Sequence, residues 1–416
     1  MEPSKVFAEW TVYASESRFR ARKTLLPLTL AERKLIALSG VRRAGKSSLL
    51  MHSFQKAESK KAYVNLEDSR LAPDALDKLL EWFGDEGTLF LDEISSIEGW
   101  EGWLARVHEM AKGRLKIICS SSRASFIKPA KPLRGRMANV ELFPLSFAEF
   151  LEFKGITPVH TVAGRGALER MLEEYLIHGG FPEVVLTQNN IEKLTITQEY
   201  FSDIVALDVA EASSQNVELA ELFGAALLKY PYFSASKFVN TLKSAGYGVA
   251  KSSLLSLERC MEEAYLFFFV PIFSFNIADR LQYSRKVYPV DTGFLHAVTG
   301  IEDKGRFYET AVFLKLRREK SIDPLIEINY WKSKEGHEVD FVIRKGMEAK
   351  QLIQVVYELG EENKSREIRA ILKAAKEFGL GKEKDQLIVV TKNHEGTEVV
   401  DGCSIHFVML RDWLLR

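Results

Sequence analysis

The fold of this chain is decided by the segment Gly40-Val41-Arg42-Arg43-Ala44-Gly45-Lys46-Ser47. It matches the phosphate-binding pattern G-x-x-x-x-G-K-[ST] at every defined position. The apolar run at 35–38 precedes it and predicts a buried strand, and residues 48–58 follow with the apolar spacing of a helix. A strand, a glycine loop and a helix in this order predict a P-loop, in which backbone N–H groups and a positive helix end hold phosphate.

The pattern gives each polar residue type a task. Lys46 is expected to reach the β- and γ-phosphates of ATP, and Ser47 to ligate Mg²⁺. The residues expected to bind ATP are Gly40, Arg42, Arg43, Ala44, Gly45, Lys46, Ser47 and Ser48. The alternative is a glycine-bearing surface turn followed by a helix, which the motif alone leaves open.

A second element supports the P-loop interpretation. The apolar run Thr88-Leu89-Phe90-Leu91 ends in Asp92-Glu93, which predicts a strand that carries two acids at its C-terminal end. Asp92 is expected to organise Mg²⁺, and Glu93 to polarise the attacking water. Alone, such a pair is usually a solvated strand end, but together with the P-loop it predicts hydrolysis of ATP.

Two further residues are catalytic candidates. Ser121 lies in the serine run after the predicted strand at 115–120, where a hydroxyl would reach the γ-phosphate or the water, although a plain serine-rich turn is the alternative. Arg136, in the run Leu133-Arg134-Gly135-Arg136, is expected to enter a neighbouring subunit's ATP site and neutralise charge in the transition state. Its alternative is a surface arginine or one that pairs within its own domain.

Composition sets limits on the remaining function classes. The chain has 416 residues, 46% of them apolar, which is enough for two to four domains. Lys plus Arg and Asp plus Glu both number 57, so no overall charge directs the chain to nucleic acid or membrane. The longest apolar stretch, residues 264–273, is too short to span a bilayer. Three widely spaced cysteines fit buried thiols in a reducing cytoplasm.

The pattern along the chain predicts an α/β protein of four domains. Residues 1–150 alternate strands and helices, which predicts a parallel sheet, with strands at 35–39, 62–66, 88–91, 115–120 and 139–143. Residues 151–212 are expected to form a helical lid, in which the helix at 169–178 ends at Gly179-Gly180. Residues 213–297 predict a winged-helix domain, and the α/β pattern restarts at 298–416.

The segment at 213–297 has the order helix, turn, helix and two-stranded ribbon. Its second helix, from Lys251 to about residue 264, would present Lys251, Ser252, Ser253 and Ser256 to a DNA groove. A polar loop carrying Arg280, Arg285 and Lys286 is expected to lead into a strand at 287–290, and Arg285 is a further candidate for DNA contact. The alternative is a winged helix that serves only for protein packing, since acidic residues dilute the second helix.

These motifs together resemble a known family. The P-loop, the segment Leu91-Asp92-Glu93-Ile94, the Leu-Arg-Gly-Arg run, Pro144-Leu145-Ser146-Phe147 and Gly179-Gly180-Phe181-Pro182-Glu183 follow the order found in prokaryotic, largely archaeal, AAA+-type ATPases. Members of that family carry a winged helix and a C-terminal restriction-endonuclease-like domain. The segment 286–293 also looks like the family's connection between those last two domains.

The resemblance implies a PD-(D/E)XK nuclease core in the last domain. Such a core holds Mg²⁺ with acids, and a lysine on the same strand as one acid orients water. Glu309 and Asp340 stand at matching positions, but Gln354 replaces the next acid, and Val356 replaces the lysine. Lys350, Lys364 and Arg366 are nearby substitutes that the sequence does not place. An inactive, vestigial site at Glu309, Asp340 and Gln354 is therefore expected.

The sequence as a whole predicts a cytoplasmic Mg²⁺-dependent ATPase that acts on DNA or on a DNA-bound complex, without membrane association. A homo-oligomer would allow Arg136 to act in trans. Two alternatives remain: a nucleotide-controlled switch that binds a protein partner, and an ATP-dependent DNA nuclease.

Overall fold

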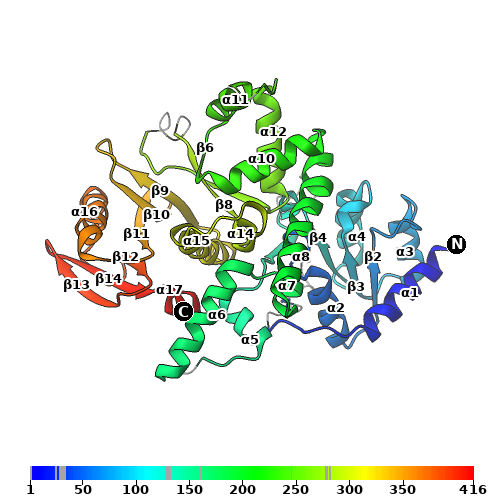
Figure 1. The fold of residues 1–416 in the computed structure, drawn as a ribbon. Coiled ribbons are helices and arrows are strands. Elements are labelled where there is room, and N and C mark those ends of the chain that lie inside the picture. The colour runs from blue at the N-terminus through cyan, green and yellow to red at the C-terminus, as the bar shows by residue number, and fades with distance from the viewer. Residues whose placement is uncertain are drawn as a thin grey trace. The chain divides into compact units, whose positions relative to one another are not determined.

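The computed structural model describes residues 2–23, 26–27, 34–127, 133–158, 161–244, 246–276, 280 and 283–416 (Figure 1). Two compact units make up the chain. Unit 1 comprises Met1–Pro144 together with Glu263–Tyr265, and unit 2 comprises Leu145–Glu262 together with Leu266–Arg416.

Unit 1 is built on a five-stranded sheet in the order β2-β3-β4-β1-β5, and every described strand pair is parallel. The strands are β1 (Leu35–Ser39), β2 (Lys61–Asn65), β3 (Gly87–Asp92), β4 (Leu115–Ser121) and β5 (Met137–Glu141). The helices are α1 (Pro3–Glu16), α2 (Lys46–Lys56), α3 (Ala75–Phe83) and α4 (Trp100–Ala111). The predicted parallel α/β sheet is thus confirmed, and each predicted strand lies within two residues of its observed bounds.

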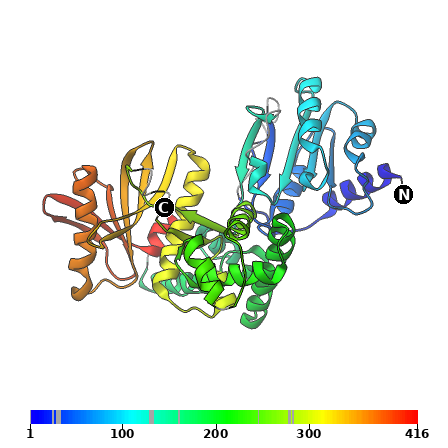
Figure 2. The same cartoon turned by 90° about the horizontal axis from the view of Figure 1, so that it is seen from above.

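The inner strands β1, β3 and β4 are buried on both faces, which explains why they are largely apolar runs. Successive residues of β1 point to opposite faces: Leu35 and Ala37 belong to one core, and Ile36 and Leu38 belong to the other. The second core also contains Phe54 of α2. Figure 2 shows these strands, in blue and cyan, with helices on either side. Because all the strands are parallel, their C-terminal ends meet at one edge, where ligands of such sheets bind.

Unit 2 begins with helices. They are α5 (Phe147–Lys154), α6 (Val162–His178), α7 (Pro182–Leu186), α8 (Asn190–Asp203), a π-helix (Ile204–Ala210), α9 (Glu211–Ser213) and α10 (Val217–Lys229). Helix α6 ends at His178, and Gly179 caps it. Gly179 has a φ of 79° and lies so close to Asp291 that a Cβ on it would be 1.6 Å from Asp291 Oδ1. The helical character expected for residues 151–212 is therefore present.

A small three-stranded sheet follows, in the order β6-β8-β7. Its elements are β6 (Tyr232–Phe233), α11 (Ala235–Ser244), α12 (Lys251–Glu263), β7 (Phe267–Val270) and β8 (Arg285–Pro289), and α14 (Gly293–Thr299) comes next. Strand β8 pairs antiparallel with both β6 and β7. Strand β8 starts at Arg285, so the expectation that Arg285 and Lys286 lie in a loop was wrong, since aromatic neighbours extend the pairing over them.

The C-terminal part of unit 2 is a six-stranded mixed sheet in the order β13-β14-β12-β11-β10-β9. Its elements are α15 (Lys304–Ile322), β9 (Ile326–Lys332), β10 (Glu338–Lys345), β11 (Glu348–Val356), α16 (Glu361–Phe378), β12 (Leu387–Thr391), β13 (Gly396–Val400), β14 (Cys403–Met409) and α17 (Leu410–Leu415). Helix α15 packs near β10 through Phe313, and α16 packs on the sheet through Ile371 (Figure 1). The predicted restart of the α/β pattern is present.

The described part of the chain bears on two expectations, one about membrane-spanning segments and one about the state of the cysteines. None of its helices is both long and apolar enough to cross a membrane. The three cysteines are free thiols, of which Cys119 and Cys260 are buried.

Candidate functional site

The P-loop connects β1 to α2 at the C-terminal edge of the unit 1 sheet. Gly45 has a φ of 95° and Arg43 a φ of 69°, so the loop curls through left-handed conformations before the helix begins at Lys46. Gly40 allows a close approach, because a Cβ there would lie 2.0 Å from the carbonyl oxygen of Leu142. Steric constraints on the backbone thus explain why glycine occupies both of these positions of the motif.

Lys46 is folded back onto its own loop. Its Nζ donates to the carbonyl oxygens of Gly40 at 3.0 Å and Val41 at 3.3 Å, and lies 3.3 Å from Glu93 Oε1. Only 5% of Lys46 is exposed. A P-loop lysine held in this way carries a positive charge within the loop that would surround a phosphate.

The two acids stand where β3 ends. Asp92 is 1% exposed and accepts hydrogen bonds from Tyr63 Oη at 2.7 Å and from the hydroxyls of Ser120 and Ser47. Burial raises the pKa of Asp92, and the charge of the adjacent Glu93 raises that pKa further. A cation near Asp92 would therefore be favoured, because it would relieve the cost of a buried negative charge.

Glu93 has a φ of 48°, a left-handed conformation that is uncommon for a side chain of its size. Its Oε2 accepts the backbone N–H of Ser122 at 2.9 Å, while its own N–H donates to Ser120 Oγ at 3.0 Å. The carboxylate is thereby fixed between the end of β4 and the P-loop lysine. This is a suitable position for a base that polarises water beside a γ-phosphate.

The structure also shows contacts that the sequence did not indicate. Ser120, not Ser121, bonds the acid pair, whereas Ser121 Oγ lies 2.8 Å from Ser95 Oγ. Tyr63 reaches Asp92 because β2 neighbours β3, a pairing that no motif encodes. Arg22, which is buried, donates to the P-loop carbonyl of Ala44 at 3.3 Å. The role predicted for Ser121 stays a prediction.

The remaining predicted residues of unit 1 are more exposed. The Arg136 guanidinium donates to Glu109 at 2.9 Å within the unit, which corresponds to the alternative considered for it. Arg42 lies 3.4 Å from Glu67, and Arg43 and Ser47 are exposed at the loop. The action of Arg136 on a neighbouring subunit stays a prediction.

The residues present fit a nucleotide with Mg²⁺. The hydroxyl of Ser47 and the carboxylate of Asp92 are hydrogen-bonded to each other, and both are hard oxygen donors of the kind that Mg²⁺ prefers. The buried Lys46 ammonium and the N-terminus of α2 provide positive charge for phosphate.

The predicted DNA-contacting residues divide into two sets. Lys251 and Ser252 are exposed at the start of α12, and Ser253 is half-buried. Arg285 instead forms an ion pair with the buried Glu258, and its guanidinium lies 5.2 Å from the ring centre of Phe269. Arg285 therefore has a packing role within unit 2.

The three predicted nuclease-site residues do come together in unit 2. Glu309 of α15 and Asp340 of β10 both contact the ammonium of Lys286, at 2.9 and 2.8 Å. The Gln354 side chain accepts from the Asp340 backbone at 3.3 Å and donates to Glu367 at 2.8 Å. The suggested substitute cations are ion-paired with Glu348 (Lys350), Glu398 (Lys364) and Glu367 (Arg366).

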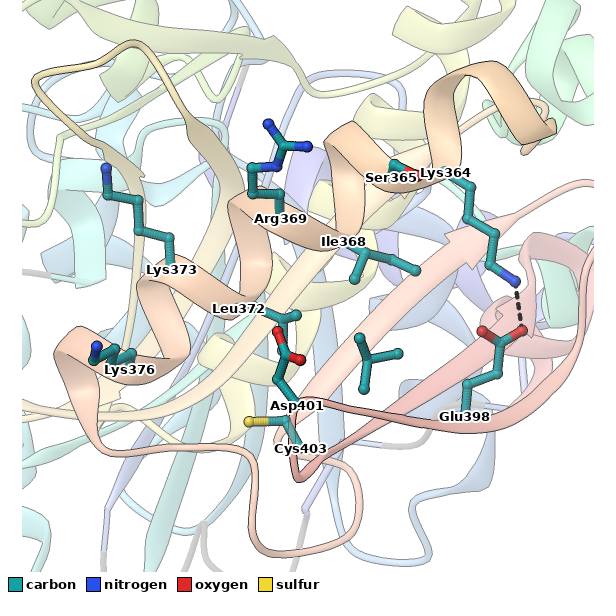
Figure 3. A pocket seen from close by; sticks show the side chains of 11 residues that line it. Lys364, Ser365, Ile368, Arg369, Leu372, Lys373, Lys376, Glu398, Asp401 and Cys403 are labelled. Carbon is teal, nitrogen blue, oxygen red and sulfur yellow. Dashed lines mark hydrogen bonds and ion pairs between the residues drawn. The ribbon is translucent and has the colours of Figure 1, made fainter.

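A groove of about 870 Å³ lies between α16 and the β13–β14 ribbon (Figure 3). The cations Lys364, Arg369, Lys373 and Lys376 line it along the helix, and Ile368 and Leu372 lie among them. The ion pair of Lys364 with Glu398, at 2.7 Å, forms one end. The groove has more basic than acidic lining residues, with Glu398 and Asp401 as its acids, and its charge therefore suits an anion.

Comparison with known proteins gives the chain its family. An uncharacterized protein of Methanocaldococcus jannaschii is 32% identical over 387 residues, which are 90% of this chain and 86% of that protein. The chain belongs to the same family as that protein. An uncharacterized protein of Haemophilus influenzae is 28% identical over 403 residues, covering 91% of this chain and 94% of its own length.

Three family models match successive parts of the chain. The first is described as an AAA domain and covers residues 32–151, so the chain carries a P-loop ATPase domain around the site described above. The others are domains of unknown function, DUF8612 over residues 169–305 and DUF4143 over residues 304–410. These two models name no activity for unit 2.

Solved structures give weaker likenesses. A RuvB variant of Thermotoga maritima has a TM-score of 0.33 at 15% identity and covers 67% of this chain and 94% of its own. A signal transduction ATPase with numerous domains and a tetratricopeptide repeat sensor, from Pyrococcus horikoshii, has a TM-score of 0.30 at 15% identity, over 75% and 48% of the two chains. With TM-scores this low, neither likeness assigns a property to this chain.

Proposed function

We propose that this chain is a Mg²⁺-dependent ATPase that hydrolyses ATP to ADP and phosphate. The observation that carries the proposal is the contact between the P-loop lysine and the acid after β3. Lys46 Nζ lies 3.3 Å from Glu93 Oε1, so the phosphate-binding loop and the candidate base share one small space. A carboxylate held at that position is placed to polarise a water beside a bound γ-phosphate, which supports hydrolysis in addition to binding.

The proposed roles follow from the geometry. Lys46 would exchange its loop carbonyls for phosphate oxygens, and Ser47 and Asp92 would hold Mg²⁺, which would supply positive charge opposite the phosphates. Glu93 accepts a hydrogen bond from the attacking water and orients it toward the γ-phosphorus. The N–H of Ser122 and the hydroxyl of Ser120 keep the two acids in position.

The test is phosphate release from MgATP by the wild type and by Lys46→Ala. The variant should lose turnover, and the matched control is Lys56→Ala, an exposed lysine at the end of the same helix α2. Turnover that survives in Lys46→Ala would refute the site, and a folded wild type that releases no phosphate would refute the activity.

We further propose that the ATPase acts on DNA or on a DNA-bound complex. The order α10, β6, α11, α12, β7, β8, with β8 between β6 and β7, supports a winged-helix domain at residues 213–297. Lys251 and Ser252 are exposed at the start of α12, the helix that such a domain places in the major groove. In the α16 groove Lys364 and Lys373 are ion-paired with Glu398 and Glu335, and Arg369 and Lys376 supply a second surface for phosphate.

The DNA proposal is tested by ATP turnover with and without duplex, forked or single-stranded DNA. DNA should raise turnover, and Lys251→Ala should reduce the increase, while Lys243→Ala, an exposed lysine of α11, should not. An increase that weakens steeply with salt indicates phosphate contacts. Turnover that no DNA changes would overturn this proposal in favour of a nucleotide-controlled switch with a protein partner.

A further inference from the structure

The nuclease-like part of unit 2 contains a buried lysine that the resemblance does not account for. Lys286 lies in β8, outside the six-stranded sheet, and is 3% exposed. Its Nζ is 2.8 Å from Asp340 Oδ1, 2.9 Å from Glu309 Oε1 and 3.0 Å from Glu338 Oε1. One ammonium thus stands among three carboxylates from two different elements, α15 and β10.

The donors of this ammonium are fully used. An ammonium has three N–H bonds, and three carboxylates accept them. Burial opposes the charge of Lys286, but the carboxylates of Asp340 and Glu309 outweigh it and raise the pKa of Lys286 well above its usual value. The lysine therefore stays charged and has no N–H left for water or a substrate phosphate.

The carboxylates are held from their other side as well. Tyr288 Oη donates to Glu309 at 2.6 Å, and the backbone N–H of Val355 donates to Asp340 Oδ2 at 2.8 Å. Tyr232 donates to Glu338. These neutral donors, the Lys286 ammonium and the exposed Lys332 ammonium, which lies 3.2 Å from Glu338 Oε2, satisfy the carboxylates of the cluster without a metal ion.

These contacts do not fit the Mg²⁺ that a PD-(D/E)XK core would hold. Within the described ranges, no group of three or more His, Cys, Asp or Glu side chains is arranged to hold a metal ion. Glu309 and Asp340, the acids at the matching positions, already share Lys286. The carbonyl of Gln354 is turned to the Asp340 backbone at 3.3 Å, so the replaced acid supplies no free ligand.

Lys286 is also not a relocated catalytic lysine. A lysine that orients water must face the space that the scissile phosphate enters. Lys286 is instead buried, with Tyr232 and Tyr330 each 5.9 Å from Nζ to the ring centre. Its position at the meeting of β8, α15 and β10 is that of a structural counter-ion.

We propose that the Lys286 ammonium takes the place of the divalent cation in the nuclease-like domain, so that the chain fills this site with its own side chain and excludes metal. The nuclease-like character of this domain is proposed from the sequence, whereas the exclusion of metal is inferred from the contacts of Lys286 alone. The consequence is that strand β8 is fixed to α15 and β10 in the absence of metal, and that this domain does not cleave DNA.

The experiment measures Mn²⁺ bound per chain without nucleotide, by titration with electron paramagnetic resonance of free Mn²⁺. The proteins are the full-length wild type, Lys286→Ala, the double variant Lys286→Ala with Asp340→Asn, and Lys332→Ala. Lys332 is the matched control, since it also pairs with Glu338, at 3.2 Å, but is exposed. Any Mn²⁺ held near the P-loop is common to all four proteins and cancels.

We expect Lys286→Ala to bind one Mn²⁺ more than the wild type, the double variant to lose it again, and Lys332→Ala to match the wild type. A folded Lys286→Ala protein without the extra ion would overturn the proposal. If that variant does not fold, Glu309→Gln decides: unchanged Mn²⁺ binding relative to wild type supports exclusion of metal, and reduced binding overturns it. ATP turnover of the same proteins tests the proposed ATPase separately, because Lys286 lies outside the P-loop site.

Discussion

Replacing Glu93 by glutamine tests the proposed mechanism most directly. The amide has nearly the same shape, and its oxygen still accepts the N–H of Ser122, now 2.9 Å from Oε2. The negative charge opposite Lys46 is lost, and so is the ability to take up proton density from water. Removal of a general base lowers turnover about 10²- to 10⁴-fold, or about 3 to 5 kcal/mol in the barrier.

The same change should leave nucleotide binding intact or tighter. In the wild type Lys46 must loosen its contact with Glu93, 3.3 Å away, before it serves phosphate. A hydrogen bond between charged groups contributes about 1.5 kcal/mol, so removing the carboxylate should lower the Kd for ATP by up to about tenfold. The loss of repulsion between Glu93 and the phosphates acts in the same direction.

The assay combines calorimetric titration of ATP with Mg²⁺ and a phosphate-release measurement on the same preparation. The matched control is Glu86→Gln, an exposed acid just before β3, at the other end of the strand from Glu93. It should change neither quantity. Turnover of Glu93→Gln within threefold of wild type would refute the role of base, and a Kd that rises tenfold would show that Glu93 supports the loop structurally.

Three further predictions concern Ser120, Gly40 and His178, and the first two compare the changed residue with a control residue of the same type. Ser120→Ala should slow turnover and weaken Mg²⁺-dependent ATP binding more than Ser121→Ala, because only the Ser120 hydroxyl bonds the acid pair; the reverse order would restore the role predicted for Ser121. Gly40→Ala should lower the free energy of unfolding, measured by denaturant titration, by about 3 kcal/mol, because the added Cβ would lie 2.0 Å from a backbone oxygen. In the same assay Gly102→Ala in α4 should be neutral or stabilising, because its Cβ would meet nothing within 4 Å. Burial lowers the pKa of His178 to about 4, so the folded state binds fewer protons than the unfolded state between pH 4 and 6.5. The melting temperature of the wild type should therefore fall as the pH drops below 6.5. The fall should be smaller in His178→Gln.

The sheet of unit 1 was predictable because its signals are local. The inner strands β1, β3 and β4 are short, largely apolar runs buried on both faces, and the steric needs of the P-loop fix the end of β1. The strand order β2-β3-β4-β1-β5 depends on pairing between segments far apart in the sequence. Because that order was not predicted, the hydrogen bond of Tyr63 to Asp92 was missed as well. The choice between Ser120 and Ser121 also depends on which face of β4 each side chain occupies, which a serine run cannot reveal.

The cluster around Lys286 was missed for a different reason. The lysine precedes Glu309 by 23 residues and Asp340 by 54, and no spacing rule links them. Charged residues beside a strand usually mark a loop, so the sequence predicts Lys286 in the polar loop before the strand. Its burial follows from the three carboxylates that accompany it, and only the folded arrangement of β8, α15 and β10 brings them together.

The two buried lysines explain why one acidic site is suited to catalysis and the other is not. Lys46 and Lys286 are almost equally buried, at 5% and 3% exposure. Two of the contacts of Lys46 are neutral carbonyl oxygens of a loop, which phosphate oxygens can replace with a gain in charge attraction. Lys286 instead holds three carboxylates, and withdrawing it would leave the buried Asp340 carboxylate without its counter-ion, a cost of about 3 to 5 kcal/mol. We therefore expect the first lysine to change partners during a reaction cycle and the second to stay fixed, which would place the proposed chemistry at the P-loop and give the acids of unit 2 a structural role.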